Sequence, residues 1–169
     1  MGLLSFIKEA GQKLFGHKEA EAAAQTAQQQ PDDAAAKAKL EDANQTAGLA
    51  ITKYIETQQL SASALNVQFD GLTSTVTVAG EAADQATKEK ILLCCGNVAG
   101  VDKVNDQMTV KTPAAESRYH TVEKGDTLSS VAKVVYGKPN EYNKIFEANR
   151  PMLSHPDKIY PGQVLRIPA

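Results

Sequence analysis

The chain has 169 residues and a net charge of −2, with 42% hydrophobic residues, so it can form one medium domain or two small domains with a linker. The slightly acidic balance argues against a nucleic-acid-binding protein, because such proteins usually carry a basic stripe. No stretch is long and apolar enough to predict a transmembrane helix. We therefore expect a small folded protein that neither binds nucleic acid nor spans a membrane.

Residues 1–16 predict a short amphipathic helix, because apolar side chains recur at roughly helical spacing. Lys8 and Glu9 interrupt the apolar run and no small-residue cleavage site follows, so the segment does not have the pattern of a signal peptide. Few basic residues are available for a membrane surface. We favour packing of this helix on the protein's own core over membrane binding.

Residues 17–45 have a different composition, rich in Ala, Gln and Glu and poor in large apolar side chains. Such a segment buries too little surface to offset the entropy of the chain. Its alanines still favour helix, and Pro31 is expected to interrupt one. We expect a solvated, partly helical linker that acts as a spacer.

Residues 46–111 predict a first folded unit of the α+β class. Asp70-Gly71 is a hairpin turn signal between two apolar, alternating segments. Two helices on one face of a small sheet would bury a core. The predicted order is helix, strand, strand, helix, strand, at about 46–55, 65–69, 75–80, 82–95 and 104–110.

The stretch from Lys88 to Val110 is the most informative part of this unit. The apolar run 91–95 predicts a buried helix end, and Gly96 follows where a helix C-terminus favours glycine. The turn 96–101 has few side-chain ligands but many backbone carbonyls. Because a buried helix C-terminus has unpaired carbonyls and a partial negative charge, solvent, another segment or a cation must satisfy them.

Residues 119–169 predict a second unit, after a short linker at 112–118. Asp126 or Thr127 is placed to cap an amphipathic helix that follows the first strand. Pro151 ends a second helix, and a turn at Pro161-Gly162 precedes the last strand. The pattern is β-α-α-β.

The neighbouring thiols of Cys94 and Cys95 would form a strained disulfide that cross-links nothing. We expect them to be buried small side chains, with redox or metal chemistry as the alternative. The three histidines lie in different regions without ligand spacing, at positions 17, 120 and 155. No catalytic motif is present, so we do not expect an enzyme.

The first unit resembles the BON domain, through Val76-x-Val78-x-Gly80 and Val98-Ala99-Gly100-Val101-x-x-Val104. The second resembles the LysM domain, through Tyr119-x-x-Val122-x-x-Gly125-Asp126-Thr127-Leu128 and Ile159-Tyr160-Pro161-Gly162-Gln163-x-Leu165. The LysM resemblance implies binding of peptidoglycan-type glycans between two loops. The residues implied for that groove are Gly125, Asp126, Thr127, Asn149 and Ile159. Turn and capping roles also account for several of them without a ligand.

The whole arrangement, a short N-terminal segment followed by BON and LysM domains, resembles a family of small bacterial cytoplasmic potassium-binding proteins. That resemblance implies a potassium ion (K+) held by backbone carbonyls of the N-terminal segment and of the turn after the second BON helix. Carried over to this sequence, the ligands would be the carbonyls of Ile7, Lys8, Ala10, Gly96, Val98 and Val101. It also implies a monomer in the cytoplasm.

The chemistry of the turn is consistent with such an ion. K+ is weakly hydrated, so neutral carbonyl dipoles can replace its water shell, whereas hard divalent ions usually require carboxylates. Three hypotheses follow: a cytoplasmic K+ sensor that compacts on binding, an envelope scaffold that binds peptidoglycan through LysM, and a membrane-surface adaptor that uses the N-terminal helix.

Overall fold

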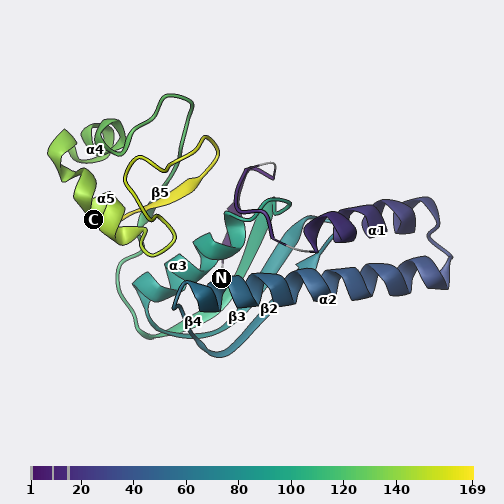
Figure 1. Cartoon of the computed structure of the whole chain (residues 1–169). Coiled ribbons are helices and arrows are strands. Elements are labelled where there is room, and N and C mark those ends of the chain that lie inside the picture. Colours follow the sequence, from purple (N-terminus) through teal and green to yellow (C-terminus); the bar gives the residue numbers. More distant parts are fainter. Residues whose placement is uncertain (1, 9, 15) are drawn as a thin grey trace.

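The computed structural model describes the whole chain except residues Met1, Glu9 and Phe15 and the side chain of His17. The chain forms two units joined by residues 113–117. Figure 1 shows the smaller, C-terminal unit beside α3, with a helical hairpin extending away from the larger unit on the opposite side.

The larger unit is built on a four-stranded sheet with strand order β1-β4-β3-β2. β3 and β4 are parallel, and the other neighbours are antiparallel. The elements confirm the predicted BON order as α2-β2-β3-α3-β4. In chain order they are β1 (Gly2–Ser5), α1 (His17–Gln29), α2 (Ala34–Thr57), β2 (Ser63–Asp70), β3 (Thr75–Asp84), α3 (Gln85–Gly96) and β4 (Lys103–Thr112).

The core of this unit lies between the sheet and the two helices α2 and α3. Val76 and Val78 alternate along β3 and are fully buried, as expected for one covered face of a strand. Ile55 of α2 and Ile91 of α3 pack into the same cluster. At the start of α3, the Asp84 carboxylate accepts a hydrogen bond from the Thr87 backbone N–H and caps the helix.

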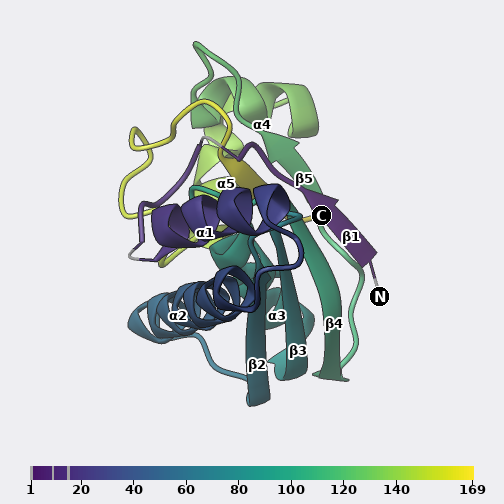
Figure 2. The same ribbon diagram turned by 90° about the vertical axis from the view of Figure 1, so that its right-hand side faces the viewer.

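The prediction of an N-terminal helix is wrong, because residues 2–5 form β1 along the outer edge of β4 (Figure 2). The open edge of β4 presents unpaired N–H and C=O groups, and strand pairing satisfies them in a way that a helix would not. Residues 6–16 continue as a loop, apart from Glu9 and Phe15, which lie outside the described residues. Packing on the protein's own core is confirmed, since Phe6 is only 8% exposed.

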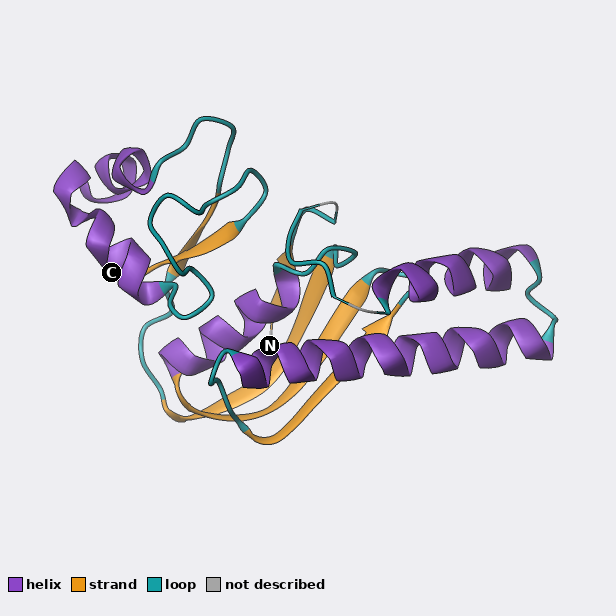
Figure 3. Cartoon of the chain, viewed as in Figure 1, coloured by secondary structure: helices purple, strands orange, loops and turns teal. Residues whose placement is uncertain are grey.

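The prediction for residues 17–45 is right about helix and about exposure of most side chains, but it is wrong that this segment is only a linker. α1 and α2 lie side by side as a helical hairpin (Figure 3), and α2 begins twelve residues before the expected helix start at residue 46. Pro31 lies in the turn between them, as expected. Small side chains allow the helices to approach closely and bury a cluster of Ala24, Ala27 and Leu40. The helix propensity of alanine and this close packing stabilise the hairpin without large apolar side chains.

The smaller unit confirms the β-α-α-β order predicted for a LysM domain. Its two strands pair in antiparallel orientation. The Thr127 hydroxyl accepts from the Ser130 N–H, and the Ser130 hydroxyl accepts from the Thr127 N–H, so Thr127 rather than Asp126 caps α4. The elements are β5 (Arg118–Thr121), α4 (Leu128–Tyr136), the 3-10 helix η1 (Pro139–Glu141), α5 (Tyr142–Ala148) and β6 (Val164–Ile167).

Candidate functional site

The N-terminal segment lies directly along the turn that follows α3. The Gly100 N–H donates to the Lys8 carbonyl at 2.7 Å. Gln12 makes two further bonds, donating to the Asn97 carbonyl at 2.8 Å and accepting from the Ala99 N–H at 3.0 Å. The structure therefore brings together the two segments that carry the predicted ligand carbonyls.

The six predicted carbonyls fall into two groups by hydrogen bonding. Three already accept backbone bonds: Ile7 from the Ala10 N–H at 2.9 Å, Lys8 as above, and Val98 from the Val101 N–H at 3.2 Å. The carbonyls of Ala10, Gly96 and Val101 accept no backbone hydrogen bond from any residue that the structure describes. Because each carbonyl oxygen has two lone pairs, acceptors in the first group can also face a cation.

The end of α3 directs one of these free carbonyls outward. The Asn97 N–H donates to the Leu93 carbonyl at 2.9 Å, which closes the last helical turn. In a trans peptide the C=O points opposite to the N–H, so the Gly96 carbonyl points beyond the helix end. The helix dipole places partial negative charge at the same end. This turn is also buried, since Val98 and Val101 are each 1% exposed.

Close backbone approach holds the N-terminal segment against the turn. A Cβ atom at Gly11 would lie 2.4 Å from the Asn97 carbonyl oxygen, and Gly11 has a φ of +124°. The Phe6 ring lies over Gly96, where a Cβ would meet its ring atoms at 2.0–2.2 Å. Only glycine fits at these two contacts.

The LysM unit also contacts the junction, meaning the place where the N-terminal segment lies against the α3 turn, and sequence reasoning did not anticipate this. A Cβ at Gly162 would lie 2.6 Å from the Ala10 Cβ and 3.3 Å from the Ile7 Cβ. The Asn97 side chain is hydrogen-bonded to the backbone of Val164 in β6. No spacing in the sequence indicates these contacts, because the residues are about 65 or more positions apart in the chain.

A buried ion pair also links the two domains. The Glu89 carboxylate, 1% exposed, lies 2.5 Å from the Arg166 Nε of β6. Burial raises the pKa of Glu89, but hydrogen bonds from Arg166, Gln85 and Ser117 outweigh it, so the pKa lies below its usual range. Sequence reasoning missed this pair, since Glu89 reads as an ordinary helix-surface residue.

The cysteines are buried as expected. Cys94 and Cys95 are both fully covered, and burial raises the pKa of the Cys94 thiol to about 12. Such thiols are inert towards redox and metal chemistry. Among the described residues, no three His, Cys, Asp or Glu side chains are grouped so as to hold a metal ion.

Most of the residues predicted for a glycan groove have structural roles within the LysM unit, and one of them is buried. The Asp126 carboxylate accepts from the Glu123 N–H and is bonded to His120, Thr127 caps α4, and Asn149 is 1% exposed. Gly125 is exposed, and Ile159 packs against the LysM core. A nearby surface hollow of about 380 Å³ includes only one of the five. It is lined by Thr127, Leu128, Ser129, Tyr142, His155, Pro156 and Asp157.

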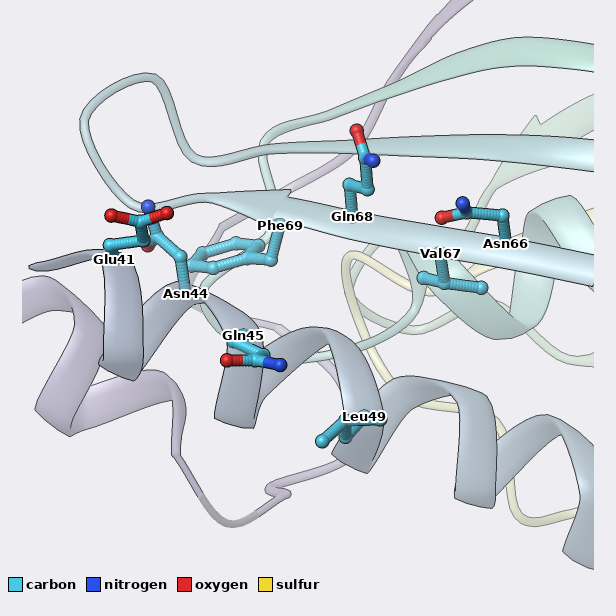
Figure 4. Close-up of a pocket in the computed structure, with 8 residues that line it drawn as sticks. All are labelled: Glu41, Asn44, Gln45, Leu49, Asn66, Val67, Gln68 and Phe69. Atoms are coloured by element: carbon cyan, nitrogen blue, oxygen red, sulfur yellow. The ribbon is translucent and has the colours of Figure 1, made fainter.

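A second hollow, of about 530 Å³, lies between α2 and the edge strand β2. In Figure 4, Val67 and Phe69 face α2 while Gln68 extends from the other side of the strand. Amides and apolar groups line it, and Glu41 is its one ionisable side chain. It therefore shows no convergent catalytic or metal-ligating groups.

Comparison with known proteins agrees with the two-domain architecture. The family profile described as "BON domain" matches residues 42–112, and that described as "LysM domain" matches residues 120–168. The chain is 47% identical over 168 residues to the "Potassium binding protein Kbp" of Escherichia coli O6:H1, covering 99% of each chain. A 49-residue stretch, 29% of this chain, is 51% identical to an "Uncharacterized protein" of Deinococcus radiodurans, covering 19% of that protein.

The E. coli relative matches across both domains and across the N-terminal segment that lies along the α3 turn. The structure has the order of BON and LysM domains that the two family profiles give, and the match to the E. coli protein extends over almost the whole chain. The chain therefore belongs to the family of the potassium binding protein Kbp, in which a BON domain precedes a LysM domain.

Proposed function

We propose that this protein binds a potassium ion at the junction of the N-terminal segment and the α3 turn. The observation that carries the proposal is the set of backbone bonds that holds residues 6–12 along residues 97–102. The proposed ligands are the carbonyls of Ile7, Lys8, Ala10, Gly96, Val98 and Val101. The name of the E. coli relative supports the same ion.

The composition of the junction favours a large monovalent cation. Backbone carbonyls can replace the weak hydration shell of K+ without a negative charge. Mg2+ and Ca2+ usually require carboxylates, and the turn 96–101 contains none. The negative end of α3 adds a favourable electrostatic term for any cation placed there.

Ion binding is proposed to compact the protein and so to sense K+ in the cytoplasm. The ion would join the N-terminal segment to the α3 turn, and both of these contact the LysM unit through Gly162 and Val164. We propose a monomeric binding protein rather than an enzyme. No helix among the described residues is long and apolar enough to cross a membrane.

Calorimetric titration of the dialysed protein with KCl, and then with NaCl, tests this function. We expect saturable heat with K+ and a much weaker response with Na+. Binding to the folded state alone should also raise the melting temperature in KCl over NaCl at equal ionic strength. Equal melting temperatures in the two salts, together with no saturable heat, would exclude the proposal.

Glycan binding by the LysM unit is the second candidate. The hollow lined by Thr127, Tyr142 and Asp157 supports it, because it places polar groups beside an aromatic ring on the surface. Co-sedimentation with purified peptidoglycan sacculi tests it. Recovery of the protein only in the supernatant would remove this candidate.

A further inference from the structure

The Asn97 side chain connects the α3 turn to the LysM domain. Its Nδ2 donates to the Val164 carbonyl at 2.9 Å, and its Oδ1 accepts from the Val164 N–H at 2.8 Å. Asn97 is 8% exposed and Val164 is 6% exposed. One buried amide thus satisfies both backbone groups of a residue 67 positions away.

The backbone of Asn97 is fixed as well, by two other segments. Its N–H donates to the Leu93 carbonyl within α3, and its carbonyl accepts from the Gln12 N–H of the N-terminal segment. All four hydrogen-bonding groups of this residue are therefore engaged, with three different parts of the chain. Asn97 is the point at which these parts meet.

The position of Asn97 in the α3 turn places it beside the proposed ion ligands. Asn97 lies between Gly96 and Val98, which both carry proposed ligand carbonyls. The rigid peptide plane before Asn97 contains the Gly96 carbonyl, and the plane after it contains the Asn97 carbonyl, which accepts from the Gln12 N–H. Because Asn97 is held on both its side chain and its backbone, undocking of β6 frees Asn97 to move and with it the plane that carries the Gly96 carbonyl.

A role confined to the turn does not account for the side chain. Among the described residues, its hydrogen bonds go only to Val164 and none to the turn itself. Asn149 makes the same two-point contact with Arg166 of β6, at 2.8 Å for each bond, but from within the LysM unit. The two asparagines therefore cover the same edge of β6, one from each domain.

We propose that Asn97 is a positioning residue that links K+ binding in the α3 turn to docking of LysM strand β6. The inference rests on the proposed function. With β6 docked, the amide fixes Asn97 and so holds the Gly96 carbonyl towards the ion; with the ion bound, the fixed turn holds β6. Because such linkage is reciprocal, each event stabilises the other.

The first test compares Asn97→Ala with wild-type full-length protein by calorimetry and by amide hydrogen exchange. We expect K+ affinity to fall about tenfold, within the usual range for linked sites. In the wild type, K+ should slow exchange of residues 164–167, although none of them is a proposed ligand. In Asn97→Ala, that slowing should be lost even at saturating K+.

Asn149→Ala is the matched control, since it removes the same pair of bonds to the same strand. At a temperature where both variants are folded, it should lower the melting temperature while retaining K+ affinity. An equal loss of K+ affinity in both variants would overturn the proposal, because affinity would then depend on how well β6 is ordered and not on its contact with Asn97. Unchanged affinity and K+-dependent exchange in Asn97→Ala would overturn it too.

Asn97→Asp keeps the size of the side chain and serves if Asn97→Ala does not fold. It retains the acceptor for the Val164 N–H but places a second oxygen against the Val164 carbonyl. Added negative charge alone would strengthen K+ binding, whereas loss of the link should abolish K+-dependent protection of β6. Protection that persists would contradict the inference, while a wild type that gives no heat with K+ would contradict the proposed function instead.

Discussion

Replacement of Gly96 by alanine tests how the N-terminal segment is held against the α3 turn. The added Cβ would lie 2.0–2.2 Å from three atoms of the Phe6 ring, so the ring must leave its site. Full burial of a phenylalanine contributes about 1.5–3 kcal/mol. Alanine is the better helix former by about 1 kcal/mol, so we expect a net loss of about 0.5–2 kcal/mol in the free energy of unfolding.

The matched variant is Phe6→Ala, which removes the ring that the new methyl group meets. In the double variant, the clash at Gly96 no longer exists and the methyl fills part of the space. The double variant should therefore be no less stable than Phe6→Ala alone. The two changes would then be non-additive by about the full cost of Gly96→Ala, as contacting residues usually are.

Urea denaturation of the four proteins, each in KCl and in NaCl, measures these quantities. Gly96→Ala should also lose most of the stabilisation that KCl gives, because the displaced segment carries half of the proposed ligands. Additive free energies across the cycle would refute the packing of Phe6 on Gly96. A K+ increment in Gly96→Ala equal to that of the wild type would refute the role of the segment in binding.

Four further predictions concern the domain junction and the cysteines. Gly162→Val should weaken K+ binding by forcing the N-terminal segment away, whereas Gly125→Ala, at another left-handed position with open space, should add only backbone strain. Glu89→Ala should cost about 3 kcal/mol, the lower end for breaking a buried pair, because it leaves the partly covered Arg166 guanidinium without its carboxylate and water can reach that group. Because the pKa of Glu89 is lowered in the folded protein, the stability that its carboxylate contributes is present above the ordinary carboxyl pKa and is lost as the pH falls through the lowered value. The free energy of unfolding of Glu89→Gln should therefore change less with pH in the acid range than that of the wild type. Cys94 and Cys95 should not react with a thiol reagent until the protein unfolds.

Local patterns predicted the elements that depend on local signals. Alternating apolar residues identified β2 and β3, Asp70-Gly71 marked their turn, and Pro31 marked the break between α1 and α2. The same patterns misplaced the N-terminal segment. Its helical spacing was a weak preference, and pairing with the open edge of β4 overrode it.

The two sides of the proposed ion site were suggested by family resemblance and by the carbonyl-rich turn. The structure shows that they are adjacent, through the bonds of Lys8 and Gln12 to the turn. The contribution of the LysM unit could not be predicted, because Asn97, Glu89 and Gly162 read locally as a helix end, a helix face and a turn. Their partners are set by how the domains pack, which periodicity does not encode.

The proposed switch by K+ depends on the balance of energies at the junction. Phe6, 8% exposed, is the one buried residue in the described part of segment 6–14, and Leu14 is partly buried against the same core, so docking of this segment depends on about 1.5–3 kcal/mol from Phe6, a smaller contribution from Leu14 and a few backbone bonds. An ion at 100 times its dissociation constant contributes about 2.7 kcal/mol to the state that binds it. The two contributions are similar in size, so under the proposed function K+ would decide whether the segment is docked. The BON and LysM cores are far larger clusters and should stay folded in both states.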